Sequence, residues 1–439
     1  MRRGHIRLAA GGSMLLLLAA TACGGSSSGG ASSGGSSAPG VTATTVTIGS
    51  TQPLTGPAAP GYSEISQASD AYFKYINENG GINGRTITYK YLDDGYDPTK
   101  TVAQTKKLIT QDKVFAIFNA LGTPTHEKVI EFLNQQKVPD LFVASGCQCW
   151  DDVSAHPETF GWQPDYVIEG KILGEYVKKN FAGKKIAYFY QDDDFGKDGV
   201  KGLDMEIPKS QVVARESYQT SNPDIASQVQ KFQSAKADVI VSFSIPAFTA
   251  LLKLNALKVK YDPTLAVSNV GSDPLTLSGL LEAFAKQGGS TVKGSDLIQG
   301  VITDGYIASP ADPTNSWIKL FQTIHDKYIP KLPFDGNVLY GMAAGYTFAQ
   351  ALAAAGANPT RDSLVKAVEA GLDQGPGLVP FRFSTSSHAG FTGVQIGVIK
   401  GTAVKLTGSP ATTDDGNGPI TAFDGTQPEA PANGIPTSG

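Results

Sequence analysis

The residues best suited to bind a small molecule lie in the segment FAIFNALGTPTHEKVIEFL, residues 115–133. Its pattern predicts an apolar strand that ends at Gly122 and a helix that follows, with Thr123 as N-cap and Pro124 at the first helical position. The first-turn N–H groups, together with the hydroxyls of Thr123 and Thr125, could hold a carboxylate at the end of the strand. The alternative is an ordinary strand-to-helix turn that binds nothing.

Motifs that suggest enzymatic or metal chemistry either lie in an unsuitable segment or lack a required residue. Two Gly-x-Ser-x-Gly matches, at residues 25–29 and 30–34, lie in a Gly/Ser-rich stretch that cannot form the strained turn of a nucleophile elbow. His126-Glu127 lacks the second histidine of a zinc-protease helix, and the acidic run at 192–194 lacks the glutamate that closes a calcium loop. We therefore expect no enzymatic activity, no metal and no cofactor.

Cysteine usage and the N-terminus both indicate export. A basic start, an apolar stretch at residues 14–20 and small residues before Cys23 resemble a bacterial lipoprotein signal. This predicts a signal peptide at 1–22, a lipidated Cys23 and a flexible Gly/Ser tether over 23–43; a plain secretory signal is the alternative. Cys147 and Cys149 form a C-x-C pair, for which a disulfide, two free thiols or a soft-metal site all remain open.

Length and charge limit the remaining classes of protein. The chain has 439 residues, of which 41% are hydrophobic and 17% charged, and a net charge of −4. It is long enough for two or three domains with sizeable cores, and it lacks the basic balance typical of nucleic-acid binding. From residue 409 to 439 the sequence is rich in Gly, Pro, Asp, Thr and Asn without any period, so a disordered tail is expected there.

Strand and helix patterns alternate through two consecutive stretches of the chain. This order predicts parallel sheets with helices on both faces, so the predicted fold class is α/β with two doubly wound lobes. Three further helices are expected within 315–370 and final strands near 381–383 and 394–400, but periodicity does not assign them to a lobe. The main strands are expected at 45–51, 86–92, 115–119, 140–145, 185–191, 212–218, 238–244 and 264–269.

The carboxyl ends of these strands carry small and polar residues. In doubly wound sheets the ligand crevice lies outside such ends, and two lobes that face each other form a cleft. The segments that follow the strands are 55–57, 122–123, 144–146, 194–195, 242–246 and 269–272.

Seven motifs in order resemble the periplasmic solute-binding proteins of branched-chain amino acid ABC importers. The resemblance covers nearly all of residues 44–405. The motifs are LTGPAA from residue 54, INENGGINGRTI from 76, YLDDGYDPTKTVAQTKKLI from 91, NALGTPT from 119, LFVASG from 141, GWQPDY from 161 and DDDFGKDG from 192.

The resemblance implies a fold and a mechanism. It implies two lobes joined by a three-strand hinge, with residues 44–163 and 306–378 in the first and residues 164–305 and 379–408 in the second. It also implies a binding protein that closes on its ligand about the hinge. A hydrolase acting in the cleft is disfavoured, because no nucleophile, base and orienting group are evident together.

The resemblance also implies ligand-binding positions. Gly122 and Thr123 match the segment that binds the ligand carboxylate in relatives, and Ala144, Ser145 and Gly146 match the next binding loop. Pocket-lining positions, for which core packing is the alternative, fall at or near Tyr62, Phe195, Ile245 and Tyr340.

One position departs from the pattern of amino-acid binders. Those proteins place an acid after the strand that matches residues 264–267, to hold the ligand ammonium. Here Asn269 stands in that part of the site, and the nearest acid is Asp273. Because a buried ammonium without a carboxylate is costly, this departure counts against an amino acid as the ligand. A hydrophobic amino acid and a related organic acid both remain as expected ligands. A short amide or urea, or an aromatic acid, is the alternative.

The resemblance and the export signal together predict the role of the chain. We expect a monomeric, lipid-anchored substrate-binding subunit on the outer face of the cell membrane, with an ABC permease as its partner and no nucleic-acid partner. The alternative is an extracellular sensor with the same fold.

Overall fold

The computed structural model describes residues 38–437 of the chain. The predicted signal peptide, the lipidation site Cys23 and most of the predicted tether lie outside these residues. Among the described helices, none is both long and apolar enough to cross a membrane.

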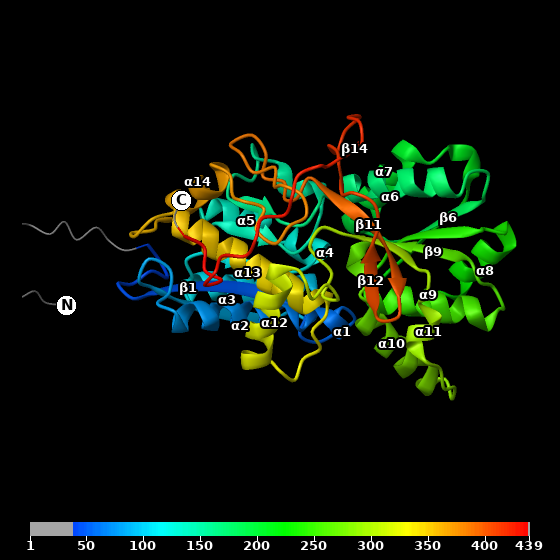
Figure 1. Cartoon of the computed structure of the whole chain (residues 1–439), viewed down its shortest axis with the longest axis horizontal. Helices are drawn as coiled ribbons and strands as arrows, with labels where there is room; N and C mark the ends of the chain where they lie inside the picture. Colours follow the sequence, from blue (N-terminus) through cyan, green and yellow to red (C-terminus); the bar gives the residue numbers. More distant parts are fainter. Residues whose placement is uncertain (1–37, 438–439) are drawn as a thin grey trace, which may run out of the picture. The chain divides into compact units, whose positions relative to one another are not determined.

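The first lobe is built on a five-stranded parallel sheet in the order β2-β1-β3-β4-β5 (Figure 1). Apolar residues such as Val46 and Ile48 are fully buried, as expected for strands covered on both faces. The strands are β1 (Thr45–Gln52), β2 (Thr86–Asp93), β3 (Ile117–Phe118), β4 (Asp140–Val143) and β5 (Thr159–Gly161).

Helices from two separate parts of the chain cover this sheet. The helix α13 packs along α2, and α12 also contacts α2, so the chain returns to the first lobe after crossing to the second. The early helices are α1 (Ala59–Tyr62), α2 (Ile65–Glu78), α3 (Pro98–Thr110), α4 (Thr123–His126), α5 (Ile130–Gln135) and the 3-10 turn η1 (Gln148–Asp151). The returning helices are α12 (Ser316–Tyr328), α13 (Gly336–Ala354) and α14 (Arg361–Glu369).

The second lobe is built on a larger, mixed sheet. Its strand order is β14-β13-β11-β10-β9-β8-β6-β7, and β12 pairs with β11. The pairs that join β7, β6, β8, β9 and β10 are parallel, whereas β11 to β14 add antiparallel pairs at one side. The strands are β6 (Ile186–Gln191), β7 (Val212–Tyr218), β8 (Val239–Phe243), β9 (Thr264–Val267), β10 (Ile302–Gly305), β11 (Gly393–Lys400), β12 (Ala403–Leu406), β13 (Ala411–Thr412) and β14 (Thr421–Ala422).

The helices of the second lobe alternate with its parallel strands, so the predicted α/β class with doubly wound lobes is confirmed. The strand expected at 381–383 is reduced to one isolated bridge between Phe381 and Phe391. The helices are α6 (Tyr166–Asn180), α7 (Asp194–Glu206), α8 (Ala226–Ala235), α9 (Pro246–Lys258), α10 (Pro274–Gln287) and α11 (Gly294–Leu297), with 3-10 turns η2 (Lys209–Gln211) and η3 (Asn269–Gly271).

Three chain segments cross side by side between the two sheets. The backbone N–H of Gly161 donates to His388 O at 3.0 Å, that of Phe391 donates to Trp162 O at 3.0 Å, and that of Leu378 donates to Tyr306 O at 2.7 Å. The rings of Trp162, Tyr306 and Phe391 pack together, with centroids 5.2 to 5.8 Å apart. These crossings define the hinge region.

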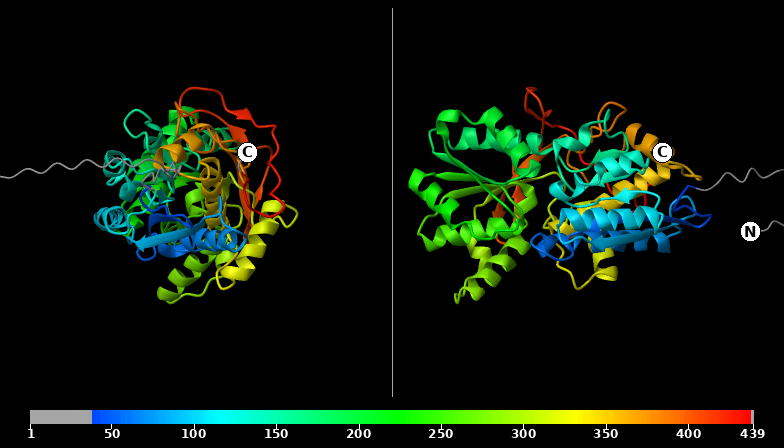
Figure 2. Two further views of the ribbon diagram at one scale, coloured as in Figure 1. Left: turned by 90° about the vertical axis from the view of Figure 1, so that its left-hand side faces the viewer. Right: turned by 180° about the vertical axis from the view of Figure 1, so that it is seen from behind.

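The predicted disordered tail is wrong for the part that the structure describes. Residues 409–437 include β13 and β14 and run back to the first lobe (Figure 2). There, Tyr72 Oη donates to Gly434 O at 2.7 Å and Trp317 Nε1 donates to Pro428 O at 2.7 Å. The tail has no hydrophobic period because its contacts are made by hydrogen bonds and by single apolar residues such as Ile435, rather than by a continuous apolar face.

The end of the predicted tether also differs. Val41 is buried, and the Thr47 N–H donates to Gly40 O at 2.8 Å, so residues 40–43 pack on the first lobe instead of forming a free coil.

Candidate ligand-binding site

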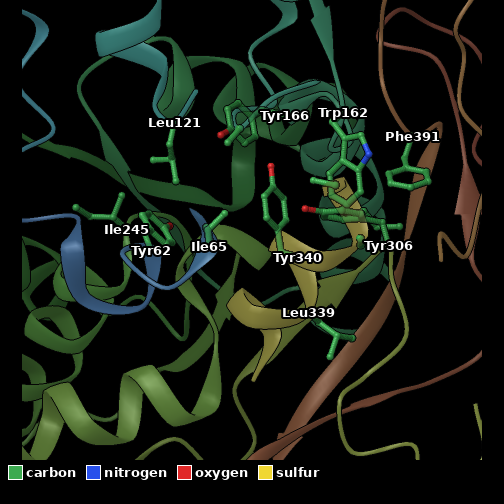
Figure 3. Close-up of a cluster of buried hydrophobic side chains, with 14 of the residues drawn as sticks. Tyr62, Ile65, Leu121, Trp162, Tyr166, Ile245, Tyr306, Leu339, Tyr340 and Phe391 are labelled. Atoms are coloured by element: carbon green, nitrogen blue, oxygen red, sulfur yellow. The ribbon is translucent and has the colours of Figure 1, made fainter. Parts of the chain in front are cut away.

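A cavity of about 360 Å³ lies between the carboxyl ends of the parallel strands of the two sheets and is lined from both lobes. This size suits a small organic ligand. Figure 3 shows part of its aromatic and aliphatic wall. The first lobe contributes Tyr62, Tyr96, Leu121, Gly122, Thr123, Ala144 and Tyr340, and the second contributes Tyr166, Phe195, Ile245, Asn269, Val270 and Asp304.

Eight of the ten predicted ligand-binding residues line this cavity. They are Tyr62, Gly122, Thr123, Ala144, Phe195, Ile245, Asn269 and Tyr340. The other two, Ser145 and Gly146, line a separate, much smaller recess instead.

Packing explains why those two residues lie behind the cavity wall. Ser145 Oγ is 2.6 Å from Thr123 Oγ1 and accepts a hydrogen bond from Cys147 N at 3.2 Å. A Cβ atom on Gly146 would lie 2.3 Å from Pro164 O, so the loop is held tightly against the crossing segment. Ser145 therefore orients the Thr123 hydroxyl, while Thr123 itself faces the cavity.

The turn after β3 differs from the predicted cap. Gly122, with φ of 112°, precedes the helix as N-cap, and Thr123 is the first residue of α4 and makes no side-chain capping bond. A Cβ at Gly122 would lie 2.6 Å from the Tyr96 ring, so both the positive φ and the close approach require glycine. The N–H of Thr123 belongs to the first turn of α4, so no carbonyl of the same helix can accept a hydrogen bond from it. It remains a suitable donor for an anionic group.

Tyrosine hydroxyls connect the two lobes around the cavity. Tyr62 Oη, in α1, donates to Val270 O at 2.6 Å, and Gln191 Nε2, in β6, donates to Tyr96 Oη at 3.2 Å. The Tyr166 hydroxyl lies against the hydroxyls of Thr123 and Ser145, and burial raises the pKa of Tyr166 above its usual range. The tyrosines therefore act as neutral hydrogen-bonding groups at physiological pH.

The charged side chains that line the cavity are all acidic. They are Asp273, Asp304 and Asp335; no Lys, Arg or His side chain is among the lining residues of the described chain. Asp273 caps α10 by accepting from Thr276 N at 2.8 Å, and its other oxygen accepts from Gly336 N of the first lobe at 3.0 Å. Any ligand carboxylate must therefore rely on N–H and hydroxyl donors rather than on a basic side chain.

Several cavity residues were not predicted from the sequence. Tyr96 follows β2, Tyr166 begins α6 after the first crossing and Tyr306 follows β10. The rule that ligands bind at the carboxyl ends of strands could have identified Tyr96 and Tyr306. Asp304 lies inside a strand and Tyr166 is the first residue of a helix, and no local signal marks either as a cavity residue.

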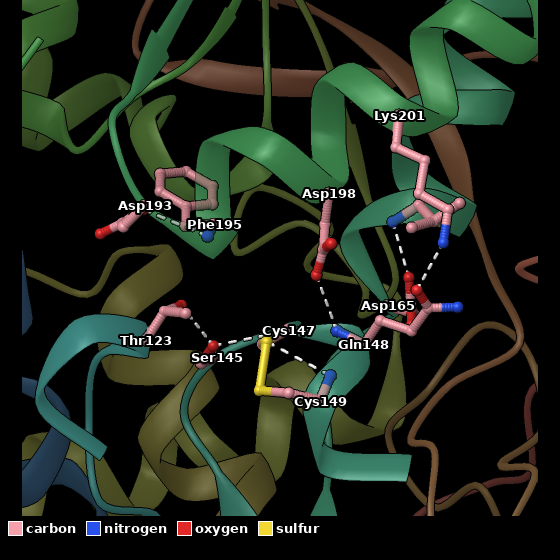
Figure 4. The surroundings of a disulfide bond; sticks show 11 residues. Thr123, Ser145, Cys147, Gln148, Cys149, Asp165, Asp193, Phe195, Asp198 and Lys201 are labelled. Carbon is pink, nitrogen blue, oxygen red and sulfur yellow. Dashed lines mark hydrogen bonds between the residues drawn. A yellow bond between two sulfur atoms is a disulfide. The ribbon is translucent and has the colours of Figure 1, made fainter. Parts of the chain in front are cut away.

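Cys147 and Cys149 form a disulfide beside the site (Figure 4). Of the three states left open by the sequence, the structure therefore contains the bonded one. Glu127 lies close to the two sulfur atoms, but bonded cysteines offer no thiolate to a metal. Between the cysteines, Gln148 N donates to Asp198 Oδ2 of the second lobe at 2.9 Å. The bridge thus stiffens a turn that contacts both lobes.

Comparisons with known proteins agree with the resemblance predicted from the sequence. A sequence profile of the family described as "Periplasmic binding protein" matches residues 45–403. The "Leu/Ile/Val-binding protein homolog 3" of Brucella melitensis is 24% identical over 199 residues, which is 44% of this chain and 53% of that protein. The chain thus matches about half the length of this relative, and 59% of a second one from Brucella suis.

Solved structures share the fold at low sequence identity. A branched-chain amino acid ABC transporter protein from Thermus thermophilus with bound valine has a TM-score of 0.72 and 18% identity, covering 84% of this chain and 97% of that one. A fatty acid ABC transporter substrate-binding protein from Thermomonospora curvata has a TM-score of 0.75 and 21% identity, covering 88% and 98%.

Proposed function

Because the chain belongs to the periplasmic binding protein family, we propose that it is the extracytoplasmic substrate-binding subunit of an ABC importer. Proteins of this family bind substrates and are not enzymes. The observation that carries the proposal is the cavity lined from both lobes at the carboxyl ends of two parallel sheets, next to a hinge of three crossing segments. Ligand binding would close the lobes about this hinge and present the closed form to a membrane permease.

The cavity favours a small ligand with an apolar body and one carboxylate. Its wall is mainly aromatic and aliphatic, and its anion-binding donors are the first-turn N–H and the hydroxyl of Thr123, supported by Ser145 and Tyr166. We propose a hydrophobic amino acid or a related organic acid. The valine bound by the Thermus protein and the fatty acid named for the Thermomonospora protein are both of this general kind.

The proposal is tested by calorimetric titration of a chain that begins at residue 38 with hydrophobic amino acids and organic acids. A strain in which the gene for this protein is deleted should also lose uptake of the ligand that binds in the titration. Binding without any loss of uptake would argue for a sensor, and turnover of the ligand would contradict a pure binding role.

Replacing Thr123 by Val should weaken binding of a carboxylate ligand about tenfold. The substitution removes one hydrogen bond to a charged group, a loss of about 1.5 kcal/mol, while Ser145 and the backbone donors remain. Titration calorimetry measures the change. Thr47→Val, in the first strand far from the cavity lining, is the matched control; an unchanged affinity in Thr123→Val would remove this hydroxyl from the site.

Replacing Cys23 by Ser should release the full-length protein from membranes into the soluble extracytoplasmic fraction. The prediction follows from the lipoprotein-like signal, since a thioether-linked lipid at Cys23 would be the anchor. Cell fractionation and immunoblotting measure the distribution, with Cys147→Ser as a control that leaves the signal intact. Continued membrane association of the Cys23 variant would contradict lipid anchoring at this residue.

A further inference from the structure

The cavity extends beyond the strand ends into a part lined by apolar side chains. These come from the start of α10, the chain after β10, the residue before Asp335 and the strand β12. We call the following residues the apolar arm of the cavity: Leu275, Ile307, Pro310, Phe334, Val404 and Leu406. The arm leads to the surface, because Leu275 is 36% exposed and the lining residues Ala311 and Thr402 are also exposed. The cavity therefore has an apolar outlet in addition to its polar end at Thr123.

Two glycines make room for one wall of the arm. Because side chains alternate along a strand, Val404 and Leu406 lie on one face of β12 and Lys405 lies on the other. A Cβ atom on Gly397, in the neighbouring strand β11, would lie 2.5 Å from Val404 Cγ1 and 3.3 Å from Leu406 Cδ2. A Cβ atom on Gly305, at the end of β10, would lie 3.4 Å from Leu406 Cδ2. The missing side chains thus allow two apolar side chains to pack down on the sheet next to the cavity.

The arm offers few polar partners to a ligand. The lining acids nearest to it in the sequence are Asp273 and Asp335. Asp273 accepts hydrogen bonds from Thr276 N and Gly336 N through its two oxygens, and Asp335 is only 1% exposed. The lining residues of the described chain also include no basic side chain. Because a polar group that is buried without a partner is costly, whereas buried hydrocarbon is favourable, the arm suits an alkyl group.

Building on the function proposed above, we propose that the apolar arm binds the unbranched alkyl tail of a monocarboxylate whose head group lies at Thr123. The occupant follows from continuity, because the arm and the carboxylate donors line one cavity and a single extended ligand can contact both. A tail longer than an amino-acid side chain leaves the strand ends and lies along Leu275 and Leu406. The ligand is then an unbranched aliphatic acid of medium chain length, and the arm residues determine which chain lengths bind well.

Calorimetric titration with a series of unbranched carboxylates tests the arm. Hexanoate, octanoate and decanoate are each titrated, below the concentrations at which they form micelles, into the chain that begins at residue 38 and so contains every described residue. The three acids share one head group and differ only in the length of the tail, and hexanoate extends no further than leucine. Burial of one methylene group is worth about fourfold in affinity when it is complete, so decanoate should bind about tenfold or more tightly than hexanoate.

Variants then locate the source of this gain. Leu275→Gln and Leu406→Gln place an amide in the arm, and each should lower the ratio of decanoate affinity to hexanoate affinity about threefold or more. A loss of stability would weaken both acids equally, so a changed ratio reports on the arm, and the second variant serves if the first does not fold. Leu257→Gln is the matched control, because Leu257 is also 36% exposed and lies on a helix but does not line the cavity. It should leave the ratio unchanged.

The outcomes separate this proposal from the proposed function. If decanoate binds no more tightly than hexanoate, or if the arm variants change the ratio no more than Leu257→Gln does, the arm is overturned while binding of short carboxylates stands. If hydrophobic amino acids bind but none of the three acids does, the arm is again overturned and the proposed function stands. If neither amino acids nor organic acids bind, both the arm and the proposed ligand class are overturned.

Discussion

Ligand affinity is expected to fall about a hundredfold between pH 6.5 and pH 8.5, because closure of the lobes gathers three carboxyl groups. Asp273 of the second lobe reaches Gly336 N of the first lobe, next to Asp335, which caps α13 through Val338 N. Glu64, which precedes α2, completes the group. The buried atoms Glu64 Oε2 and Asp335 Oδ2 have no hydrogen-bond partner among the described residues.

The direction of the effect follows from the pKa values of the closed form. Burial, and next the charge of Asp273, raises the pKa of Glu64 to about 7 and that of Asp335 to about 8. Opening removes Asp273, so both pKa values are lower in the open form and closure takes up protons. The closed form is therefore fully stable at low pH and is weakened as pH rises through about 7 to 8. Between the open-form and the closed-form pKa of a group, closure weakens about tenfold per pH unit, and above the closed-form pKa the loss levels off.

Titration calorimetry across this range measures the effect, with a ligand that does not itself titrate there. Asp273→Asn is the informative variant, because asparagine still caps the helix but carries no charge. It can accept from only one of Thr276 N and Gly336 N, so its overall affinity is lower and the readout is the slope of the pH profile. This variant should bind with a much flatter pH profile. A wild-type affinity that is constant from pH 6.5 to 8.5, or an equally steep profile in Asp273→Asn, would contradict the prediction.

Much of the fold could be predicted because it is encoded locally. Strand and helix patterns depend on neighbours in the sequence, and so do the observed N-caps Asp97 and Asp165, whose side chains accept from N–H groups two or three residues further on. Residues directly after parallel strands, including Gly122 and Asn269, could be placed at the cavity because parallel strands end at one edge of a sheet.

The residues that were missed depend on contacts between distant parts of the chain. Glu169 lies inside a helix and Asp304 inside a strand, 135 positions apart by number, and only folding brings both to Asn269. The sequence around Asn269 therefore suggested that no acid was available. Ser145 and Gly146 show the converse, since their position after β4 is right for the cavity but side-chain packing turns them away.

The C-terminal segment shows most clearly why composition alone misled. The side chain of Lys171, on α6, is 2% exposed. Its ammonium group donates hydrogen bonds to oxygens of the loop 413–418. It donates to Thr413 Oγ1 at 2.8 Å and to the carbonyls of Asp414, Gly416 and Gly418 at 2.8, 2.7 and 3.0 Å. The glycines and aspartates that suggested disorder are the residues that let the backbone wrap around a cation.

Ending the chain at Thr412 should therefore lower the free energy of unfolding by about 3 to 5 kcal/mol, because it leaves the Lys171 charge buried without its acceptors. Adding Lys171→Met to the shortened chain should restore most of this loss, since methionine fills a similar volume without a charge. Urea denaturation measures the free energy of unfolding of both variants.

A chain that ends at Asp424 is the matched control. It keeps the loop 413–418 and β14 but loses the contacts of Pro428 and Gly434 with the first lobe. It gives up six hydrogen bonds between residues 427–434 and the first lobe but keeps the acceptors of Lys171, so it should lose less free energy of unfolding than the chain that ends at Thr412. If the two truncations cost the same, or if Lys171→Met fails to rescue the shorter one, the segment would stabilise the protein through its contacts with the first lobe rather than by solvating a buried charge.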